Sequence, residues 1–376
     1  QRRRAGEEPA APASRRREVD AELPRIQGDA TTTSQMRDNV SALHNSKPLP
    51  LLRARAADAD AGSCFFDATA APAGVDADKH VFCLPGVVNI GVQKGGTGEL
   101  QTWLTAHPSF LAHGGEVHFF DGERLARRGC DRREGGRLRV AYARYLWRRW
   151  SPLEAQVAGR FVFEKTPAYF DQASPQVLAC AVPSARLLLM LRRPEARAFS
   201  AYQMCTREMH ARWCTEPFDA ALERSLQTGD GSEAPSLRAL RNEPQLKRML
   251  VMGQYALHLR RWLGAFDASQ FGVLWLEQFK RSPFTCIHAI ERFVGARPHD
   301  YRTQATRNRA GLWVVGKSKS SQAGTSQADG GAKARISPWA NKTLHEFYAP
   351  WQRRLRRLLE RTNASLLPLE ERLLSG

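Results

Sequence analysis

Residues 87–98, Val-Val-Asn-Ile-Gly-Val-Gln-Lys-Gly-Gly-Thr-Gly, decide the fold of this chain. They predict a buried β-strand and a glycine turn, and residues 99–104 predict the start of a helix. A helix N-terminus has unpaired backbone N–H groups and partial positive charge, and adjacent glycines let the backbone close around phosphate oxygens. Lys94 adds a full positive charge. The stretch therefore predicts a phosphate-binding turn in an α/β fold.

The order of residues in this turn separates it from two common nucleotide sites. A Walker A loop places its lysine after the glycines and follows it with Ser or Thr, whereas Lys94 precedes the glycines here. The G-x-G-x-x-G fingerprint of dinucleotide-binding proteins is absent too. Another phosphate-bearing ligand is thus favoured over ATP and NAD. The alternative is an ordinary strand-to-helix turn with a solvated lysine.

Four later segments carry charged and polar residues at motif-like spacing: 116–121 (E-V-H-F-F-D), 165–170 (K-T-P-A-Y-F), 191–202 (L-R-R-P-E-A-R-A-F-S-A-Y) and 333–338 (K-A-R-I-S-P). With the turn, and in this order, they resemble the sulfotransferases that use PAPS (3′-phosphoadenosine 5′-phosphosulfate). The resemblance is closest to heparan sulfate glucosaminyl 3-O-sulfotransferases and to the N-sulfotransferase domain of N-deacetylase/N-sulfotransferases. It covers roughly residues 85 to 360 and is loose between the motifs.

The resemblance implies a donor site for PAPS, and for the product PAP, with two anion-binding regions. Charge-assisted donors suit both phosphates. The residues implied are Lys94, Gly95, Gly96, Thr97 and Gly98 at the phosphosulfate, Arg192 and Ser200 at the 3′-phosphate, and Tyr255, Lys333 and Arg335 around the nucleotide. The alternatives are a surface arginine that caps a strand, a helical serine and a core tyrosine.

The resemblance also implies catalytic roles. Lys94 and Lys165 would neutralise charge on the departing phosphate from two sides. An alcohol is a poor nucleophile until its proton is taken, so a base must lie within hydrogen-bond reach, and Glu116 is the candidate. His118 would face the same way in an extended segment, and Asp121 and Gln93 would position the acceptor. Alternatively, His118 lies at a core edge and Glu116 is a surface charge.

Two departures from the family pattern concern the acceptor. Gln93 stands where family members usually carry arginine. The interval between Asp121 and Lys165 is longer than expected, and it is basic through Arg124, Arg127, Arg128, Arg132, Arg133, Arg137, Arg139, Arg144, Arg148 and Arg149. Both changes would alter the acceptor and not the donor.

The predicted organisation is a single α/β domain, a central parallel sheet flanked by helices with a P-loop-like turn. Further strands are expected at 160–164, 185–191 and 271–276, because these are short apolar runs. Residues 1–80 are expected to be a disordered low-complexity stem before a domain at 81–376, with a flexible Gly/Ser-rich loop at 316–331 that could close over the nucleotide. A basic helix is expected after Pro350.

The net charge, the apolar runs and the glycosylation sequons limit which partners and compartments suit the chain. Residues 1–80 hold 12 Lys+Arg and 12 Asp+Glu, so the whole formal excess of +18 belongs to residues 81–376. Such an excess attracts anionic polysaccharides, and no nucleic-acid-binding motif appears. No run of 18 apolar residues is present, and an N-terminal anchor could be missing from a chain that begins at Gln1. Three N-x-[ST] sequons permit a Golgi lumen or other secretory location.

Seven cysteines leave at least one unpaired, and Cys205 and Cys214 are close enough in sequence to bridge a loop. No metal-ligand spacing stands out, and sulfuryl transfer requires no metal. The predicted function is sulfuryl transfer from PAPS to a hydroxyl or amine of a glycan, in particular a heparan-sulfate-like polysaccharide. The alternatives are transfer to a small metabolite or protein tyrosine, a non-catalytic basic glycan-binding protein, and, least favoured, a P-loop kinase.

Overall fold

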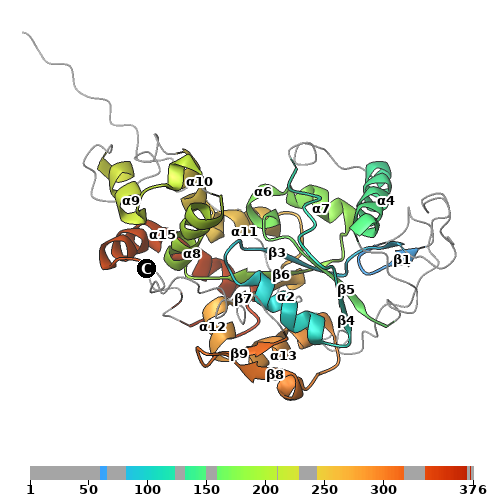
Figure 1. Cartoon of the computed structure of the whole chain (residues 1–376). Coiled ribbons are helices and arrows are strands. Elements are labelled where there is room, and N and C mark those ends of the chain that lie inside the picture. Colours follow the sequence, from blue (N-terminus) through green and yellow to red (C-terminus); the bar gives the residue numbers. More distant parts are fainter. Residues whose placement is uncertain are drawn as a thin grey trace, which may run out of the picture. The chain divides into compact units, whose positions relative to one another are not determined.

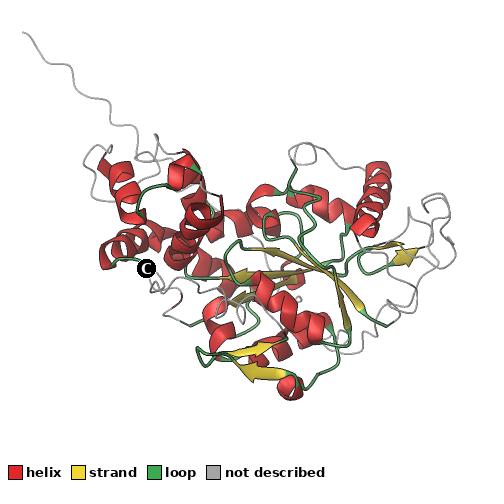
Figure 2. Ribbon diagram, in the orientation of Figure 1, coloured by secondary structure: helices red, strands yellow, loops and turns green. Residues whose placement is uncertain are grey.

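The computed structural model describes residues 60–65, 82–122, 132–149, 159–209, 211–227, 244–316, 335–370 and 373. A five-stranded parallel sheet with the order β4-β5-β3-β6-β7 forms their centre (Figures 1 and 2). Its strands are β3 (Val87–Gly91), β4 (Phe110–Ala112), β5 (Phe161–Lys165), β6 (Arg186–Leu191) and β7 (Phe271–Trp275). The predicted fold class is confirmed.

The central strands are buried on both faces, which explains their continuous apolar runs. Successive residues of β6 alternate between two cores: Leu187 and Leu189 join one, whereas Leu188 and Met190 join the other. Because side chains alternate along a strand, helices must cover both faces of the sheet. Figure 1 shows these two helical layers.

One layer contains α4 (Arg132–Arg149), α6 (Tyr169–Gln172), α7 (Pro175–Ala181) and α11 (Tyr255–Leu263). The other contains α2 (Thr97–Ala106), α12 (Leu276–Arg281) and α13 (Pro283–Val294), beside the hairpin of β8 (Ala305–Arg307) and β9 (Trp313–Val315). A third core joins α8 (Pro194–Met204), α9 (Phe218–Gln227) and α10 (Pro244–Val251) to α15 (Pro338–Thr362).

Two expectations about the chain ends need correction. Residues 60–65 fall within the expected stem, yet β1 (Cys64–Phe65) pairs with β2 (Phe82–Cys83), and a disulfide joins Cys64 to Cys83. The buried side chain of Phe65 belongs to the main core, so this part of the stem is folded. Residues 1–59 and 66–81 lie outside the described part. The basic helix expected after Pro350 begins at Pro338 and contains Pro350 in its interior.

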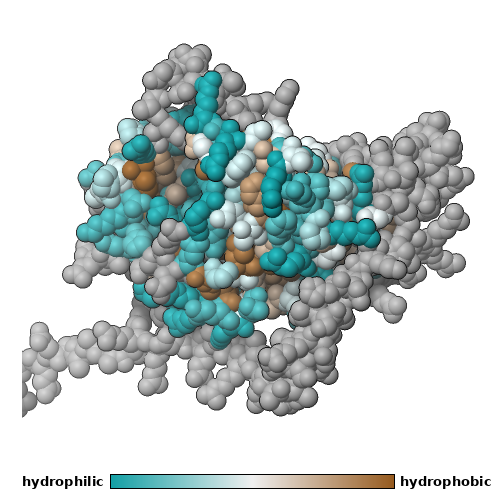
Figure 3. All heavy atoms as spheres, turned by 90° about the horizontal axis from the view of Figure 1, so that it is seen from below, coloured by the Kyte–Doolittle hydropathy of each residue, from teal (hydrophilic) through white to brown (hydrophobic). Residues whose placement is uncertain are grey.

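Hydrophilic side chains predominate on the face shown in Figure 3, where the apolar residues form small separate groups. Among the described helices, none combines the length and apolar character needed to cross a membrane.

Candidate active site

The turn between β3 and α2 has the geometry expected of a phosphate-binding loop. Lys94 and Gly96 have φ angles of 66° and 89°, in the left-handed region, and α2 begins directly at Thr97. A Cβ on Gly95 would lie 2.3 Å from the carbonyl oxygen of Met190, so no side chain fits there. Gly98 has open space around it. The helix N-terminus therefore meets a backbone that only glycine allows at its tightest point.

Arg192, directly after β6, ties the second predicted anion site to this turn. Its guanidinium donates to the carbonyl oxygen of Lys94 at 3.2 Å, and its own carbonyl accepts the Tyr255 hydroxyl at 2.7 Å. Ser200 is half-buried on α8, two turns further along the chain. Tyr255 is 1% exposed and packs in the main core, the position of a core tyrosine, where it supports the backbone of Arg192.

Glu116, His118, Lys165 and Asp121 lie together in one cluster. The Lys165 ammonium lies 2.9 Å from Glu116 Oε1, and His118 Nε2 lies 3.1 Å from Glu116 Oε2. His118 Nδ1 is 2.6 Å from Asp121 Oδ2. Glu116 and Lys165 are 49 positions apart in sequence, yet the fold brings them together, so that the candidate base contacts both His118 and the lysine at the end of β5.

His118 does not have the extended conformation that the sequence predicts for residues 116–121. The segment is a loop, not an extended strand, and His118 has a φ of 54°. A left-handed conformation at a residue other than glycine is sparsely populated and requires support from its surroundings. His118 reaches Glu116 through this turn and not through strand alternation.

That support comes from a buried bridge below the cluster. Thr166 Oγ1 accepts hydrogen bonds from the backbone N–H groups of Val117 (2.9 Å) and His118 (3.3 Å), and it donates to Glu164 Oε2 (3.1 Å). The hydroxyl of Tyr142, on α4, donates to the other oxygen of Glu164 at 2.5 Å. Burial raises the pKa of Glu164 to about 7, although these hydrogen bonds oppose the shift. Thr166 belongs to the motif at residues 165–170, but the sequence does not predict that it bridges the loop to Glu164.

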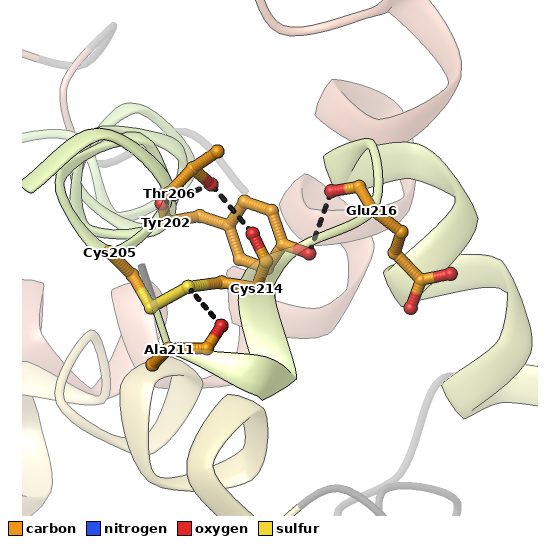
Figure 4. The surroundings of a disulfide bond; sticks show 6 residues. All are labelled: Tyr202, Cys205, Thr206, Ala211, Cys214 and Glu216. Carbon is orange, nitrogen blue, oxygen red and sulfur yellow. Dashed lines mark hydrogen bonds between the residues drawn. A yellow bond between two sulfur atoms is a disulfide. The ribbon is translucent and has the colours of Figure 1, made fainter. Parts of the chain in front are cut away.

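A disulfide closes the turn that follows α8, close to Lys94. Cys205 and Cys214 are joined, and the Thr206 hydroxyl lies 3.0 Å from the carbonyl oxygens of both Tyr202 and Cys214 (Figure 4). Lys94 Nζ is 3.4 Å from the sulfur of Met204, the residue before Cys205. The bridge thereby braces the end of α8 where it meets the lysine.

Three further residues of the predicted site are Gln93, Lys333 and Arg335. Gln93 is half-buried in the turn, and Arg335 is exposed before α15. Lys333 and the expected flexible loop after Gly316 lie outside the described residues. Within the described part of the chain, no group of three or more His, Cys, Asp or Glu side chains is arranged to hold a metal ion.

Comparisons with known proteins agree on one family. The family model of the sulfotransferase domain matches residues 85–346. Human bifunctional heparan sulfate N-deacetylase/N-sulfotransferase 3 is 34% identical over 226 residues, which cover 57% of this chain and 23% of that protein. For the human enzyme numbered 1 the identity is 30% over 239 residues, covering 61% and 24%. The chain thus spans about a quarter of the length of these curated relatives.

A solved structure supports the same assignment. The sulfotransferase from Alicyclobacillus acidocaldarius is 25% identical and superposes with a TM-score of 0.50, covering 73% of this chain and 96% of that one.

Proposed function

Because the chain belongs to the sulfotransferase domain family, whose members generally use PAPS as donor, we propose that it transfers a sulfuryl group from PAPS to an oxygen or nitrogen of a glycan. The observation that carries the proposal is the cluster of Glu116, His118 and Lys165, in which Lys165 pairs with Asn89 on the strand that leads into the phosphate-binding turn. The likeness to heparan sulfate N-deacetylase/N-sulfotransferases supports a heparan-sulfate-like acceptor.

In the proposed reaction the acceptor attacks the sulfur in line with the bond to the leaving phosphate. Glu116 takes the acceptor's proton as the new S–O or S–N bond forms, and the S–O bond to the phosphate breaks, which releases PAP. Lys94 and Lys165 stabilise the charge that develops on the leaving oxygen. Arg192 and Ser200 hold the 3′-phosphate, and no metal takes part.

Two disulfides among the described cysteines support a secretory compartment such as the Golgi lumen, because such bonds persist in oxidising surroundings. The buried Cys286 is a free thiol. We propose this location together with an anionic polysaccharide partner, which suits the formal net charge of +18.

The test is the substitution Glu116→Gln, assayed by acceptor-dependent release of PAP from PAPS. We expect turnover to fall by roughly a hundredfold or more, in the range of losses for a general base, because the amide cannot take a proton. The binding of PAP, measured by calorimetry, should persist. Glu360→Gln, an exposed carboxylate on α15, is the matched control and should retain full activity. Wild-type turnover in the Glu116 variant would remove this residue as the base.

A further inference from the structure

A carboxylate lies beside the arginine that is proposed to hold the 3′-phosphate. The parallel strands β6 and β7 end at the same edge of the sheet, where Leu191 pairs with Trp275. Arg192 follows β6 directly, and Glu277 is the second residue after β7. Glu277 Oε1 accepts a hydrogen bond from the backbone N–H of Arg193 at 3.2 Å. The segment after β7 is therefore tied to the segment that carries Arg192.

The start of α12, where Glu277 lies, also touches the phosphate-binding turn. A Cβ on Gly96 would lie 2.4 Å from Leu276 Cδ1, so Leu276 packs directly against the turn. Arg192 reaches the same turn from β6, because its guanidinium donates to the carbonyl oxygen of Lys94. A guanidinium carries five N–H donors, so Arg192 can hold the turn and still offer donors to a phosphate. Glu277, next to Leu276, thus lies where the turn and Arg192 meet.

The second oxygen of Glu277 acts on Arg192 through its charge. Glu277 Oε2 is buried and has no hydrogen-bond partner within the described structure. Most buried polar atoms are hydrogen-bonded, so an unpaired carboxylate oxygen requires an explanation. Burial lowers the pKa of the Arg192 guanidinium, and the charge of Glu277 is the first influence that opposes this shift. The two side chains therefore stabilise each other's charge.

The other charged side chains that act on Arg192 are cations. Arg197 and Arg193 both disfavour a further positive charge there, and the side chain of Arg197 has no exposed surface. The buried carboxylate of Glu195 is paired with a histidine of α15. Glu277 is thus the carboxylate with the largest effect on Arg192. Removal of its charge would leave an anion at Arg192 among cations, and the anion would be held more tightly.

We propose that Glu277 limits how tightly the 3′-phosphate of the nucleotide is held, so that PAP is released readily after transfer. The carboxylate and the phosphate compete for the positive charge of Arg192, and as like charges they repel each other. This role of Glu277 rests on the proposed function and adds to it a residue that sets the affinity for the nucleotide. The role is electrostatic, because the hydrogen bond from the Arg193 backbone requires only an oxygen acceptor.

The substitution Glu277→Gln removes the charge and keeps the shape, and its amide oxygen can still accept from the N–H of Arg193. Calorimetry compares the binding of PAP with that of adenosine 5′-phosphate, which lacks the 3′-phosphate. We expect the variant to bind PAP roughly tenfold more tightly, as for one screened charge in a partly buried site, and to bind adenosine 5′-phosphate within roughly twofold of the wild type. The rate of PAP release, measured by stopped-flow displacement, should fall by a similar factor.

Glu277→Asp keeps the charge and should bind PAP as the wild type does. Glu360→Gln, an exposed carboxylate on α15, is the matched control for the loss of one negative charge. Higher salt should narrow the difference between the wild type and Glu277→Gln, because counterions screen the repulsion that the substitution removes.

These binding measurements need no acceptor. If Glu277→Gln gains affinity for PAP alone while no glycan is sulfated, the role of Glu277 stands and only the proposed function fails. Equal PAP affinity in the wild type and Glu277→Gln, or an equal gain for both nucleotides, would overturn the role of Glu277. A gain in Glu277→Asp equal to that in Glu277→Gln would overturn it too, since the charge is then not the cause.

Discussion

The hydroxyl of Thr166 is the residue-scale feature on which the candidate cluster depends. Its oxygen accepts two backbone N–H groups of the loop that carries Glu116 and His118, and its proton goes to the buried Glu164. Thr166 itself has no exposed surface. A single side chain thus fixes the position of a strained loop relative to the strand end at Lys165.

Replacing Thr166 with Val keeps the shape of the side chain and removes its oxygen. Two backbone donors and one carboxyl oxygen then lose their partner, at a cost of about 1–3 kcal/mol for each unsatisfied buried group. We expect a lower denaturation midpoint and at least tenfold slower PAP release. Thr166→Ser, which keeps the oxygen, should restore both. A Val variant with wild-type stability and turnover would show that the loop is held by other contacts.

At the scale of elements, two glycines of the turn from β3 to α2 differ in the space around them: Gly95 is tightly enclosed and Gly98 is open. Gly95→Ala would bring a Cβ to 2.3 Å from the backbone oxygen of Met190, whereas Gly98→Ala would place it in open space. We expect Gly95→Ala to weaken PAP binding by at least tenfold and to lower the unfolding midpoint, because the tightly packed backbone at Met190 cannot move aside as the end of a side chain could. Gly98→Ala should leave the unfolding midpoint unchanged. Calorimetry and thermal denaturation measure both effects. Equal behaviour of the two variants would contradict the close approach.

The elements that sequence could predict are those with long or regular apolar patterns. The strands β3, β5, β6 and β7 follow the expected runs within one residue or two at each end. The sequence does not predict the strand β4, because its three residues are too few to show an apolar pattern. The sequence predicts a helix after Pro350, but the packing of Leu344 and Phe347 in the third core extends α15 on its N-terminal side as far as Pro338.

For the candidate site, the motifs predicted the phosphate turn and the meeting of Glu116, His118 and Lys165, since the family resemblance carried their order. They gave no role to Thr166. Thr166 acts through hydrogen bonds to Val117 and His118, which are 49 and 48 positions away in sequence, and a local motif cannot predict contacts over such separations.

At the scale of the whole molecule, two buried carboxyls make stability depend on pH. The folded pKa of Glu164 is about 7 against an ordinary 4.5, and that of Asp171 is about 6 against 3.8. Between these values the folded state binds more protons than the unfolded state, so stability falls as pH rises from about 4 to 7. For Glu164 alone the loss would approach roughly 3 kcal/mol, at about 1.4 kcal/mol for each pKa unit.

Glu164→Gln removes the larger of these two titrations. We expect its free energy of unfolding, measured by chemical denaturation from pH 5 to 7.5, to vary with pH less steeply than that of the wild type. Glu360→Gln should keep the wild-type slope. Parallel slopes for the wild type and Glu164→Gln would place the ionisation of Glu164 outside this window.

The order of strands in the sheet also sets when the donor site takes shape during synthesis of the chain. β3 lies between β5 and β6, both of which follow it in sequence, and the N–H of Val92 in the turn donates to Met190 on β6. Parallel pairing between distant segments must wait until both are present. A nascent chain that has left the ribosome only as far as α2 therefore carries the phosphate-binding residues without the neighbouring strands β5 and β6 that hold β3 and the turn in place. The turn becomes a site only after β6 has been translated.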